Sequence, residues 1–456
     1  MNPPIPPSKS SYDQLLLWEE VGCEPRKEHK KSENNKIYPE DRPVHDWYRF
    51  VLSFPPHLVR AYLQRFQLNQ NHTVLDPFCG TGTTLVECKK LGIASRGIEA
   101  NRMAHFAGQV KTDWSPDPGG LRRHASRVAK KASAQMDAGK IEQNLFYKNP
   151  KQETTNLLTL PPEQFKLLLK DSISPLPLHK ILVLRDTLKE LYDERYYRHE
   201  LLALAKTLVY SAGNLCFGPE VGVGVAKVDA PVLSDWMKEI EAIADDLQSL
   251  KGKNDASSTV FQADAREINQ VLEPDSVDAV ITSPPYPNEK DYTRTTRLES
   301  VVLGFIKDKE DLRLLKKTLV RSNTRGVYKN DADDQWISNF PEIQRLAETI
   351  ESKRIELGKT SGFERMYHRV TRLYFGGMAK HLAALREVLR RGAWLAYVVG
   401  DQASYLRVKI QTGFLLADIA KSLGYEVAGI DLFRTRLATA TKEQLREEVV
   451  ILRWSG

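Results

Sequence analysis

Asp76-Pro77-Phe78-Cys79-Gly80-Thr81-Gly82-Thr83 is the stretch of this sequence that decides the fold. A short apolar segment, 73–75, precedes it, and a helical pattern follows from Leu85 to Lys90. A second apolar segment, 94–98, then ends at Glu99. A strand, a glycine loop, a helix, a second strand and an acid in this order open a Rossmann-like unit. The sequence therefore predicts an α/β protein built on a largely parallel sheet.

The glycine loop predicts a ligand with an anionic group. Backbone N–H groups at a glycine turn and at the following helix N-terminus attract negative charge. In a dinucleotide enzyme this group is a pyrophosphate, and in a methyltransferase it is the carboxylate of a methionine moiety. The loop has neither the GxGxxG spacing of a dinucleotide fold nor the Gly-Lys-Ser/Thr ending of a P-loop. Glu99 is placed to accept hydrogen bonds from ribose hydroxyls, and Asp264, at the end of a third strand, from an adenine amine.

Two insertions interrupt the predicted sheet. The remaining strand patterns lie at 259–264, 277–282, 393–399, 425–431 and 448–454. Between the second and third strands, 111–255 reads mainly as helices, and a polar segment, 305–365, forms the second insertion. We expect a discontinuous catalytic domain, 45–110 and 256–456, with 111–255 as the candidate DNA-recognition region. Residues 1–44 are polar and rich in Pro, Lys and Glu, which predicts a flexible arm.

Ser283-Pro284-Pro285-Tyr286 follows the fourth predicted strand and is the most informative loop. Proline has no N–H, so the loop leaves its carbonyls available as acceptors. The Ser283 hydroxyl and the Pro284 carbonyl can both accept from an exocyclic amine, which localises the nitrogen lone pair toward an electrophile. Tyr286 offers a face on which a base can stack. A base inside a duplex cannot reach such a loop, so the sequence predicts base flipping.

At this point the sequence resembles the DNA amino-methyltransferases. The stretch Asp76 to Thr83 looks like their cofactor motif, and Thr282-Ser283-Pro284-Pro285-Tyr286 looks like their catalytic motif in the variant typical of N4-cytosine enzymes. The segment from Trp47 to Pro56 is similar to the one that completes the cofactor pocket in that family. The resemblance implies a Rossmann-like class I S-adenosylmethionine-dependent methyltransferase sheet with helical insertions.

The resemblance also implies roles for particular residues. The S-adenosylmethionine site would be formed by Trp47, Phe54, Asp76, Phe78, Gly80, Gly82, Thr83, Glu99 and Asp264. The target base would be held by Ser283, Pro284, Pro285 and Tyr286. The sequence departs from the family in two places: the third motif reads Ala263-Asp264-Ala265 where Gly-Asp is more common, and the large insertion follows the second strand.

Several substrates stay open. Transfer to cytosine N4 in double-stranded DNA is the main hypothesis, with adenine N6 as the alternative, because adenine enzymes more usually carry Asp or Asn in place of Ser283. RNA base methyltransferases share the DPFCGxG pattern but end in Asn- or Asp-Pro-Pro-Tyr. A catalytically inactive nucleic-acid-binding protein is a further alternative. Methylation at cytosine C5 is disfavoured, because none of the four cysteines follows a proline.

Four arginines are candidates for contacts with DNA phosphates. Arg294 and Arg297 follow the catalytic loop, and Arg321 and Arg325 lie in the second insertion. The formal net charge of +7 is compatible with a nucleic-acid partner without requiring one. A cognate restriction or defence protein is a possible further partner.

The remaining composition excludes several classes of protein. The cysteines form no CxxC pair and no cluster with histidine, so the sequence predicts no metal site. No apolar run is long enough to span a membrane, and the first nine residues lack the apolar region of a secretory signal. We therefore expect a cytoplasmic protein without a membrane partner.

Overall fold

The computed structural model describes residues 36–49, 53–146, 157–217, 221–252, 256–288, 290–437 and 443–456. One seven-stranded sheet organises the chain in the order β5-β2-β1-β6-β7-β9-β8. Its strands are β1 (Thr73–Asp76), β2 (Ala94–Ile98), β5 (Ser258–Phe261), β6 (Val277–Thr282), β7 (Leu389–Gly400), β8 (Glu426–Leu437) and β9 (Gln444–Arg453). All neighbouring pairs are parallel except those that β9 makes with β7 and β8.

This strand order confirms the predicted Rossmann-like methyltransferase sheet. The order runs outward from the central pair β1 and β6, toward β2 and β5 on one side and toward β7 on the other. In an open parallel sheet of this kind, the crevice at the carboxyl ends of the two central strands is the place where ligands bind. The glycine loop follows β1 and Ser283 follows β6, so both predicted motifs lie at this crevice.

Consecutive residues of the central strands point to opposite faces of the sheet, as the pleat requires. On one face, Val74, Ile281 and Ala396 pack with α3 (Pro56–Arg65) and α4 (Thr83–Lys90). On the other face, Leu75, Val280 and Leu395 pack with α15 (Tyr367–Leu385) and α16 (Thr412–Ser422). The apolar character of these strands on both sides is therefore explained by two covering layers of helices.

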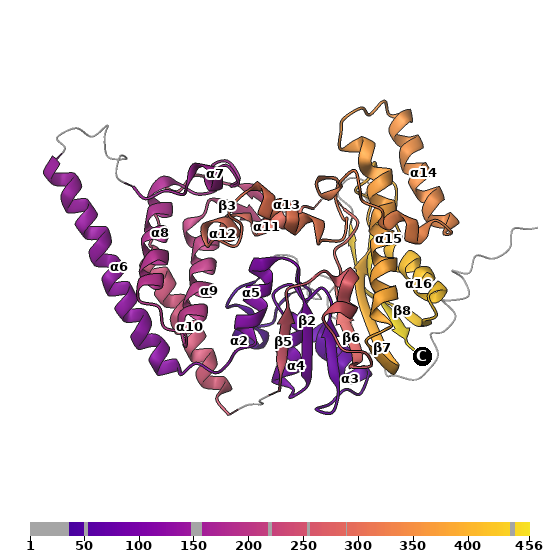
Figure 1. Cartoon of the computed structure of the whole chain (residues 1–456), viewed down its shortest axis with the longest axis horizontal. Helices are drawn as coiled ribbons and strands as arrows, with labels where there is room; N and C mark the ends of the chain where they lie inside the picture. The colour runs from indigo at the N-terminus through magenta and orange to yellow at the C-terminus, as the bar shows by residue number, and fades with distance from the viewer. Residues whose placement is uncertain are drawn as a thin grey trace, which may run out of the picture.

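The segment expected to be mainly helical, 111–255, folds as a helical body beside β2 and β5 (Figure 1). Its main helices are α6 (Pro118–Phe146), α8 (Pro175–Glu190), α9 (Tyr197–Thr207) and α10 (Val232–Leu250), with a short α7 (Pro162–Phe165). Helix α5 (Arg102–Lys111) lies between this body and the sheet (Figure 1). A π-helix, η2 (Leu208–Ala212), leads into a hairpin of β3 (Leu215–Phe217) and β4 (Val221–Val223).

The second insertion, 305–365, divides between two cores. Leu315 of α13 (Lys309–Lys317) belongs to the core of the helical body. Ile343 and Ile350 of α14 (Pro341–Glu356) belong to the core around α15. Two short turns, η4 (Thr324–Gly326) and η5 (Asp333–Ile337), connect these helices, and η6 (Glu364–Met366) follows α14. The second insertion therefore contributes residues both to the core of the helical body and to the core around α15.

The predicted arm, 1–44, is partly corrected. Residues 1–35 lie outside the described residues, but 36–44 lie against the protein as η1 (Pro39–Asp41) and the start of α2 (Arg42–His45). Asp41 is buried and its carboxylate lies 2.7 Å from the Arg60 guanidinium. An ion pair between the buried Asp41 and the partly exposed Arg60 holds this stretch in place, which the polar composition did not predict. No helix within the described ranges is long and apolar enough to cross a membrane.

Candidate active site

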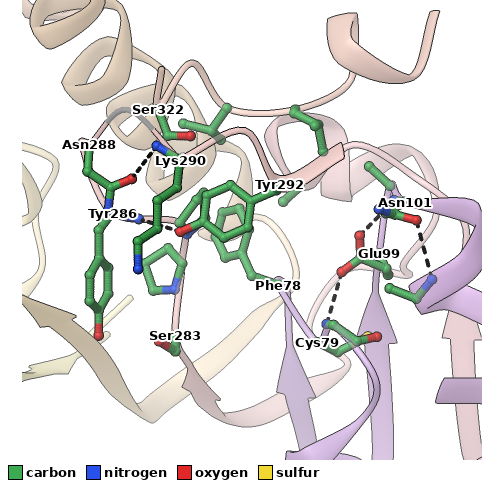
Figure 2. A pocket seen from close by; sticks show the side chains of 18 of the residues that line it. Phe78, Cys79, Glu99, Asn101, Ser283, Tyr286, Asn288, Lys290, Tyr292 and Ser322 are labelled. Carbon is green, nitrogen blue, oxygen red and sulfur yellow. Dashed lines mark hydrogen bonds between the residues drawn. The ribbon is translucent and has the colours of Figure 1, made fainter. Parts of the chain in front are cut away.

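A cavity of about 680 Å³ lies at the carboxyl ends of the central strands. Residues after β1, β2, β5 and β6 line it, together with the segment before α3, the segment after α13 and the β8–β9 pair. Of the predicted site residues, those that line it are Phe54, Phe78, Gly80, Thr83, Glu99, Asp264, Ser283, Pro284, Pro285, Tyr286 and Arg321. Figure 2 shows Phe78 and Glu99 in the same cavity as Ser283 and Tyr286. The fold thus joins the two predicted motifs in one site.

The two glycines of the β1 loop have different tasks. Gly80 has a φ of +52°, and a Cβ at this position would meet no atom within 4 Å, so its backbone faces open space in the cavity. Gly82 has a φ of +84° and precedes the first residue of α4, but it does not line the cavity. A Cβ on Gly82 would lie 3.3 Å from the Cα of Gly108 in α5. Gly82 therefore permits close helix packing, which corrects its predicted role in direct cofactor binding.

Glu99 is held at the tip of β2 by backbone donors. Its Oε2 accepts from the Gly80 N–H at 2.9 Å, and its Oε1 accepts from the Asn101 N–H at 2.7 Å (Figure 2). Burial raises the pKa of Glu99 to about 7, although these N–H donors act in the opposite direction. A carboxylate oriented in this way has acceptor capacity left for ligand hydroxyls.

Asp264 lines the cavity, but its carboxylate already has a strong partner. Arg266 donates to Oδ1 from Nε at 3.0 Å and to Oδ2 from a terminal nitrogen at 2.6 Å. Arg266 also lies 2.5 Å from Asp333 and donates to the Lys317 carbonyl at 2.8 Å. Asp264 therefore anchors the end of β5 to the second insertion, and any contact with an adenine amine uses the acceptor capacity that Arg266 leaves.

Asp76 does not line the cavity and is fully buried. Its Oδ1 accepts from the Thr282 hydroxyl at 2.6 Å and from the Phe78 N–H at 3.1 Å, and its Oδ2 accepts from the Thr84 hydroxyl at 2.7 Å. Burial raises the pKa of Asp76 to about 6. Asp76 thus ties the end of β1 to the end of β6, so its predicted contact with the cofactor is replaced by a structural role.

The catalytic loop is held by contacts from distant elements. The Ser283 hydroxyl donates to the Val398 carbonyl of β7 at 3.2 Å. The Tyr286 N–H donates to the Tyr292 hydroxyl at 3.2 Å (Figure 2). A Cβ on Gly400 would lie 3.0 Å from the Tyr286 ring, so the ring packs against bare backbone at this position. Burial, and secondarily the nearby Glu447 carboxylate, raises the pKa of the Tyr286 hydroxyl.

Sequence reasoning missed several residues of the site. Asn101, Tyr292 and Glu447 line the cavity, as do Asn288 and Lys290 beside the catalytic loop (Figure 2). Burial raises the pKa of Tyr292 to about 12, so its hydroxyl is neutral at neutral pH. Tyr292 lies six residues after Tyr286, in α11 (Tyr292–Thr295), and this proximity to the motif was the available signal.

Gln402 was not among the residues assigned to the cofactor or the base, and it also lines the cavity. It follows Gly400 at the end of β7, where the strand reaches the carboxyl edge of the sheet. Its position next to a predicted strand end was the signal in the sequence.

Two of the four candidate arginines are used inside the protein. Arg297 donates to the Thr293 hydroxyl at 2.8 Å and to the Leu167 carbonyl at 3.3 Å. Arg321 is 5% exposed and makes a bidentate pair with Asp331, with both nitrogen–oxygen distances 2.8 Å. These partners inside the protein argue against the predicted role of Arg297 and Arg321 as phosphate clamps. Arg294 is half-buried, whereas Arg325 is exposed, with its guanidinium 5.5 Å from the centre of the Phe363 ring.

Trp47 also lies outside the cavity. Its ring is buried in the core of the helical body, and its Nε1 donates to Asp246 Oδ2 of α10 at 2.7 Å. The same oxygen accepts from the Val44 N–H at 2.8 Å. The prediction that Trp47 touches the cofactor is corrected, while Phe54, from the same segment, does line the cavity. Among the side chains within the described ranges, no group of three or more His, Cys, Asp or Glu is arranged to hold a metal ion.

The chain is similar to known DNA-modifying enzymes. A family described as DNA methylase matches residues 8–107. The Type II methyltransferase M.BsoBI of Geobacillus stearothermophilus is 26% identical over 454 residues, which cover 91% of this chain and 85% of that protein. The Type II methyltransferase M.AvaI of Nostoc sp. is 24% identical, over 90% of this chain and 86% of that protein.

Among solved structures, TrmN from Thermus thermophilus matches 91% of this chain and 52% of that chain at 11% identity. The TM-score of this match is 0.28.

Proposed function

We propose that this chain, a member of the DNA amino-methyltransferase family, transfers a methyl group from S-adenosylmethionine to the exocyclic N4 of a cytosine in double-stranded DNA. Methyl transfer from S-adenosylmethionine to DNA is the activity of the family, and the choice of N4 is the proposed part. One observation carries the proposed methyl transfer: Ser283 and Tyr286 share one cavity with Phe78, Gly80 and Glu99. The choice of N4 over adenine N6 is based on Ser283 alone.

The residues at the glycine-loop end fit S-adenosylmethionine. The cavity volume of about 680 Å³ lies within the range of small-molecule sites. Gly80 presents open backbone, Glu99 offers a carboxylate to ribose hydroxyls, and Phe78 and Phe54 supply apolar walls. We propose that these residues, with Thr83 and Asp264, hold the cofactor. When bound, it supplies an electrophilic methyl group, and transfer to N4 leaves S-adenosylhomocysteine and a proton.

The catalytic loop would hold and orient the target amine. The Ser283 hydroxyl and the Pro284 carbonyl are the acceptors that the loop offers to an exocyclic amine. Hydrogen bonds from the amine to these oxygens would localise its lone pair and direct it toward the methyl group. Pro285 stiffens the loop, and Tyr286 offers its ring to the base. The base has to leave the duplex to enter this cavity, so the proposal includes base flipping.

Adenine N6 stays the second candidate for the same reaction. The acceptors of the loop fit any exocyclic amine, since both cytosine N4 and adenine N6 present two N–H groups. The serine at position 283 favours cytosine, because the adenine enzymes that the motif resembles usually carry Asp or Asn there. A cognate restriction enzyme is a further proposed partner, in line with the Type II designation of both near-full-length relatives.

We propose that the second insertion contributes the DNA-facing rim of the cavity. Arg325 is exposed, and its neighbour Gly326 lines the cavity, so we propose Arg325 as a contact with DNA beside the cavity. The Arg325 guanidinium lies 5.5 Å from the centre of the Phe363 ring, which is 51% exposed, in a cation–π contact. Arg294, next to the catalytic loop, is the second proposed contact. The helical body, 111–255, would form the opposite wall.

A salt titration tests this rim. Arg325→Ala should lower the slope of log affinity against log salt by about one unit, as expected for one lost phosphate contact. Arg391→Ala is a matched control, since Arg391 is also exposed but lies at the start of β7, away from the carboxyl edge. Equal slopes in the wild type and Arg325→Ala would contradict this contact.

A labelled transfer assay tests the proposed acceptor. The protein is incubated with S-adenosylmethionine carrying a labelled methyl group, with duplex DNA in one reaction and total RNA in another. Label is expected in DNA, and sequencing of the product would then map the modified sites. Label in RNA and not in DNA would overturn the proposal.

A further inference from the structure

We propose that Tyr48 and Glu299 are positioning residues that couple the cofactor end of the cavity to the base end. The inference rests on the proposed function, because it assigns these two ends to S-adenosylmethionine and to the target base. The Tyr48 hydroxyl donates to Glu299 Oε1 across 251 positions of sequence, and both side chains are buried. Neither residue lines the cavity, so any effect on methyl transfer acts through the elements that they join.

Tyr48 belongs to a short segment that we call the clasp, residues 41–49. Its His45 ring lies 2.8 Å from Glu87 of α4, and its Trp47 donates to Asp246 of α10 at 2.7 Å. The chain continues from the clasp to Ser53 and Phe54, which line the cavity. Phe54 follows the clasp by only five residues in sequence, so we expect the position of Phe54 to depend on how firmly the clasp is held.

Glu299 belongs to the segment that follows the catalytic loop. It lies in α12 (Arg297–Val302), directly after α11, whose Tyr292 hydroxyl accepts from the Tyr286 N–H. Glu299 is 0% exposed, and within the described structure its Oε2 has no hydrogen-bond partner. Burial raises the pKa of Glu299 to about 7, and the Tyr48 hydrogen bond opposes this shift. The buried carboxyl group therefore depends strongly on the Tyr48 hydroxyl.

A second contact joins the same elements. Asn101 Nδ2 donates to the Thr296 hydroxyl at 2.9 Å, at the junction of α11 and α12. The Asn101 N–H donates to Glu99 Oε1 at 2.7 Å. Glu99, on the cofactor side, is thus connected through Asn101 to the segment that supports Tyr286. Two independent contacts to one short segment restrict its movement more than either contact alone.

This geometry has a direct consequence for the reaction. The rate of a transfer between two bound groups depends steeply on their separation, and a misplacement of about 1 Å can cost roughly 100-fold. The clasp and α12 set the relative positions of Phe54 and Tyr286. Binding of a cofactor at one end should therefore favour DNA binding at the other, and the preference should depend on the Tyr48–Glu299 hydrogen bond.

The test compares the DNA dissociation constant with and without S-adenosylhomocysteine, using a duplex that carries a mapped site. In the wild type, S-adenosylhomocysteine should tighten DNA binding about fivefold or more. Tyr48→Phe, which removes one oxygen, and Glu299→Leu should bring this ratio close to 1 and slow single-turnover methyl transfer about tenfold. Glu299→Gln keeps an acceptor for the Tyr48 hydroxyl, so its binding ratio and its transfer rate should stay close to those of the wild type.

Glu200→Leu is the matched control. Glu200 is also 0% exposed, and it is bonded to His124 at 2.7 Å within the helical body. This variant should lose stability while keeping the binding ratio and the transfer rate of the folded protein.

A wild-type ratio near 1, or a Tyr48→Phe variant with unchanged ratio and rate, would overturn the inference. The binding ratio requires no methyl transfer, so it is independent of which base is modified. A failure of the proposed function would appear instead as the wrong labelled product in the transfer assay.

Discussion

The two ends of the cavity are built in different ways. At the cofactor end, Glu99 is held by residues close to it in sequence, because Gly80 and Asn101 donate to it from their backbone N–H groups. The base end depends on distant elements, because Val398 accepts from Ser283 and Gly400 makes room for the Tyr286 ring. A site made of local contacts can be recognised from a short motif. Where distant residues hold a motif in place, the motif can be recognised in the sequence, but the residues that hold it cannot.

This difference predicts that the two ends can be damaged separately. Local backbone hydrogen bonds at the cofactor end survive changes in the catalytic loop. The catalytic loop can be altered through Tyr286, or through the strand end that it packs against, while the glycine loop stays in place. Substitution of residues that contact a ligand should change methyl transfer or cofactor affinity the most. Substitution of residues that only hold these contacts in place should change them less.

Tyr286→Ala should have the largest effect and separate the ends most clearly. Loss of a stacking face costs about 1–3 kcal/mol per base, so methyl transfer per DNA encounter should fall up to about 100-fold. The cofactor dissociation constant, measured by calorimetry, should stay within about twofold of wild type, since Glu99 and Gly80 are held locally. An equal loss of cofactor binding and methylation would contradict the assignment of Tyr286 to the base end.

Glu99→Gln should weaken the other end. A hydrogen bond to a charged acceptor contributes about 1.5–3 kcal/mol, so the dissociation constant of S-adenosylmethionine should rise at least about tenfold at pH 8. Single-turnover transfer at saturating cofactor should change much less than in Tyr286→Ala. Unchanged cofactor affinity in Glu99→Gln would show that ribose hydroxyls bind elsewhere.

Cofactor affinity of the wild type should depend on pH. The pKa of Glu99 is raised to about 7, so below this pH most of the cofactor-free protein carries a protonated Glu99. If the ribose hydroxyls need the carboxylate as acceptor, binding releases this proton, and affinity falls as pH falls. Calorimetry should show a dissociation constant about tenfold higher at pH 6 than at pH 8. The Glu99→Gln variant is the control and should lose this component of the pH dependence.

Gly400→Ala should have the smallest effect on methyl transfer, and it tests whether Gly400 sets the position of the Tyr286 ring. The added Cβ would lie 3.0 Å from the Tyr286 ring, so the ring must shift by a few tenths of an ångström. Methyl transfer should fall about threefold to tenfold, as small displacements near reacting groups cost rate. Gly429→Ala is a suitable control, because a Cβ there would meet no atom within 4 Å. Wild-type rates in Gly400→Ala would show that the Tyr286 ring position is not critical.

The sequence predicted the sheet and the location of both motifs. β2 and β6 have the expected bounds, because each is a short apolar run that ends at a polar motif. Glu99 and Ser283 lie in the cavity for the same reason, since the ends of parallel strands meet at one edge. These predictions require only the local pattern of apolar and polar residues and the geometry of a parallel sheet.

Predictions that depended on tertiary contacts failed. Trp47 looked like a cofactor residue, but Asp246, about 200 positions away in sequence, takes its indole N–H. Arg321 looked like a phosphate contact, but Asp331 holds its guanidinium inside the protein. Gly400 and Tyr292 were not assigned to the base end, because their roles depend on contacts with Tyr286 that the sequence does not show. A single sequence does not show which distant partner satisfies a polar side chain.

Mass spectrometry of methylated DNA tests the central proposal most directly. Duplex DNA is treated with the protein and S-adenosylmethionine carrying a labelled methyl group, digested to nucleosides and analysed. We expect labelled N4-methyldeoxycytidine with the wild type and a strongly reduced amount with Tyr286→Ala. Labelled N6-methyldeoxyadenosine, or 5-methyldeoxycytidine, in its place would contradict the assignment of the Ser283 loop to cytosine N4.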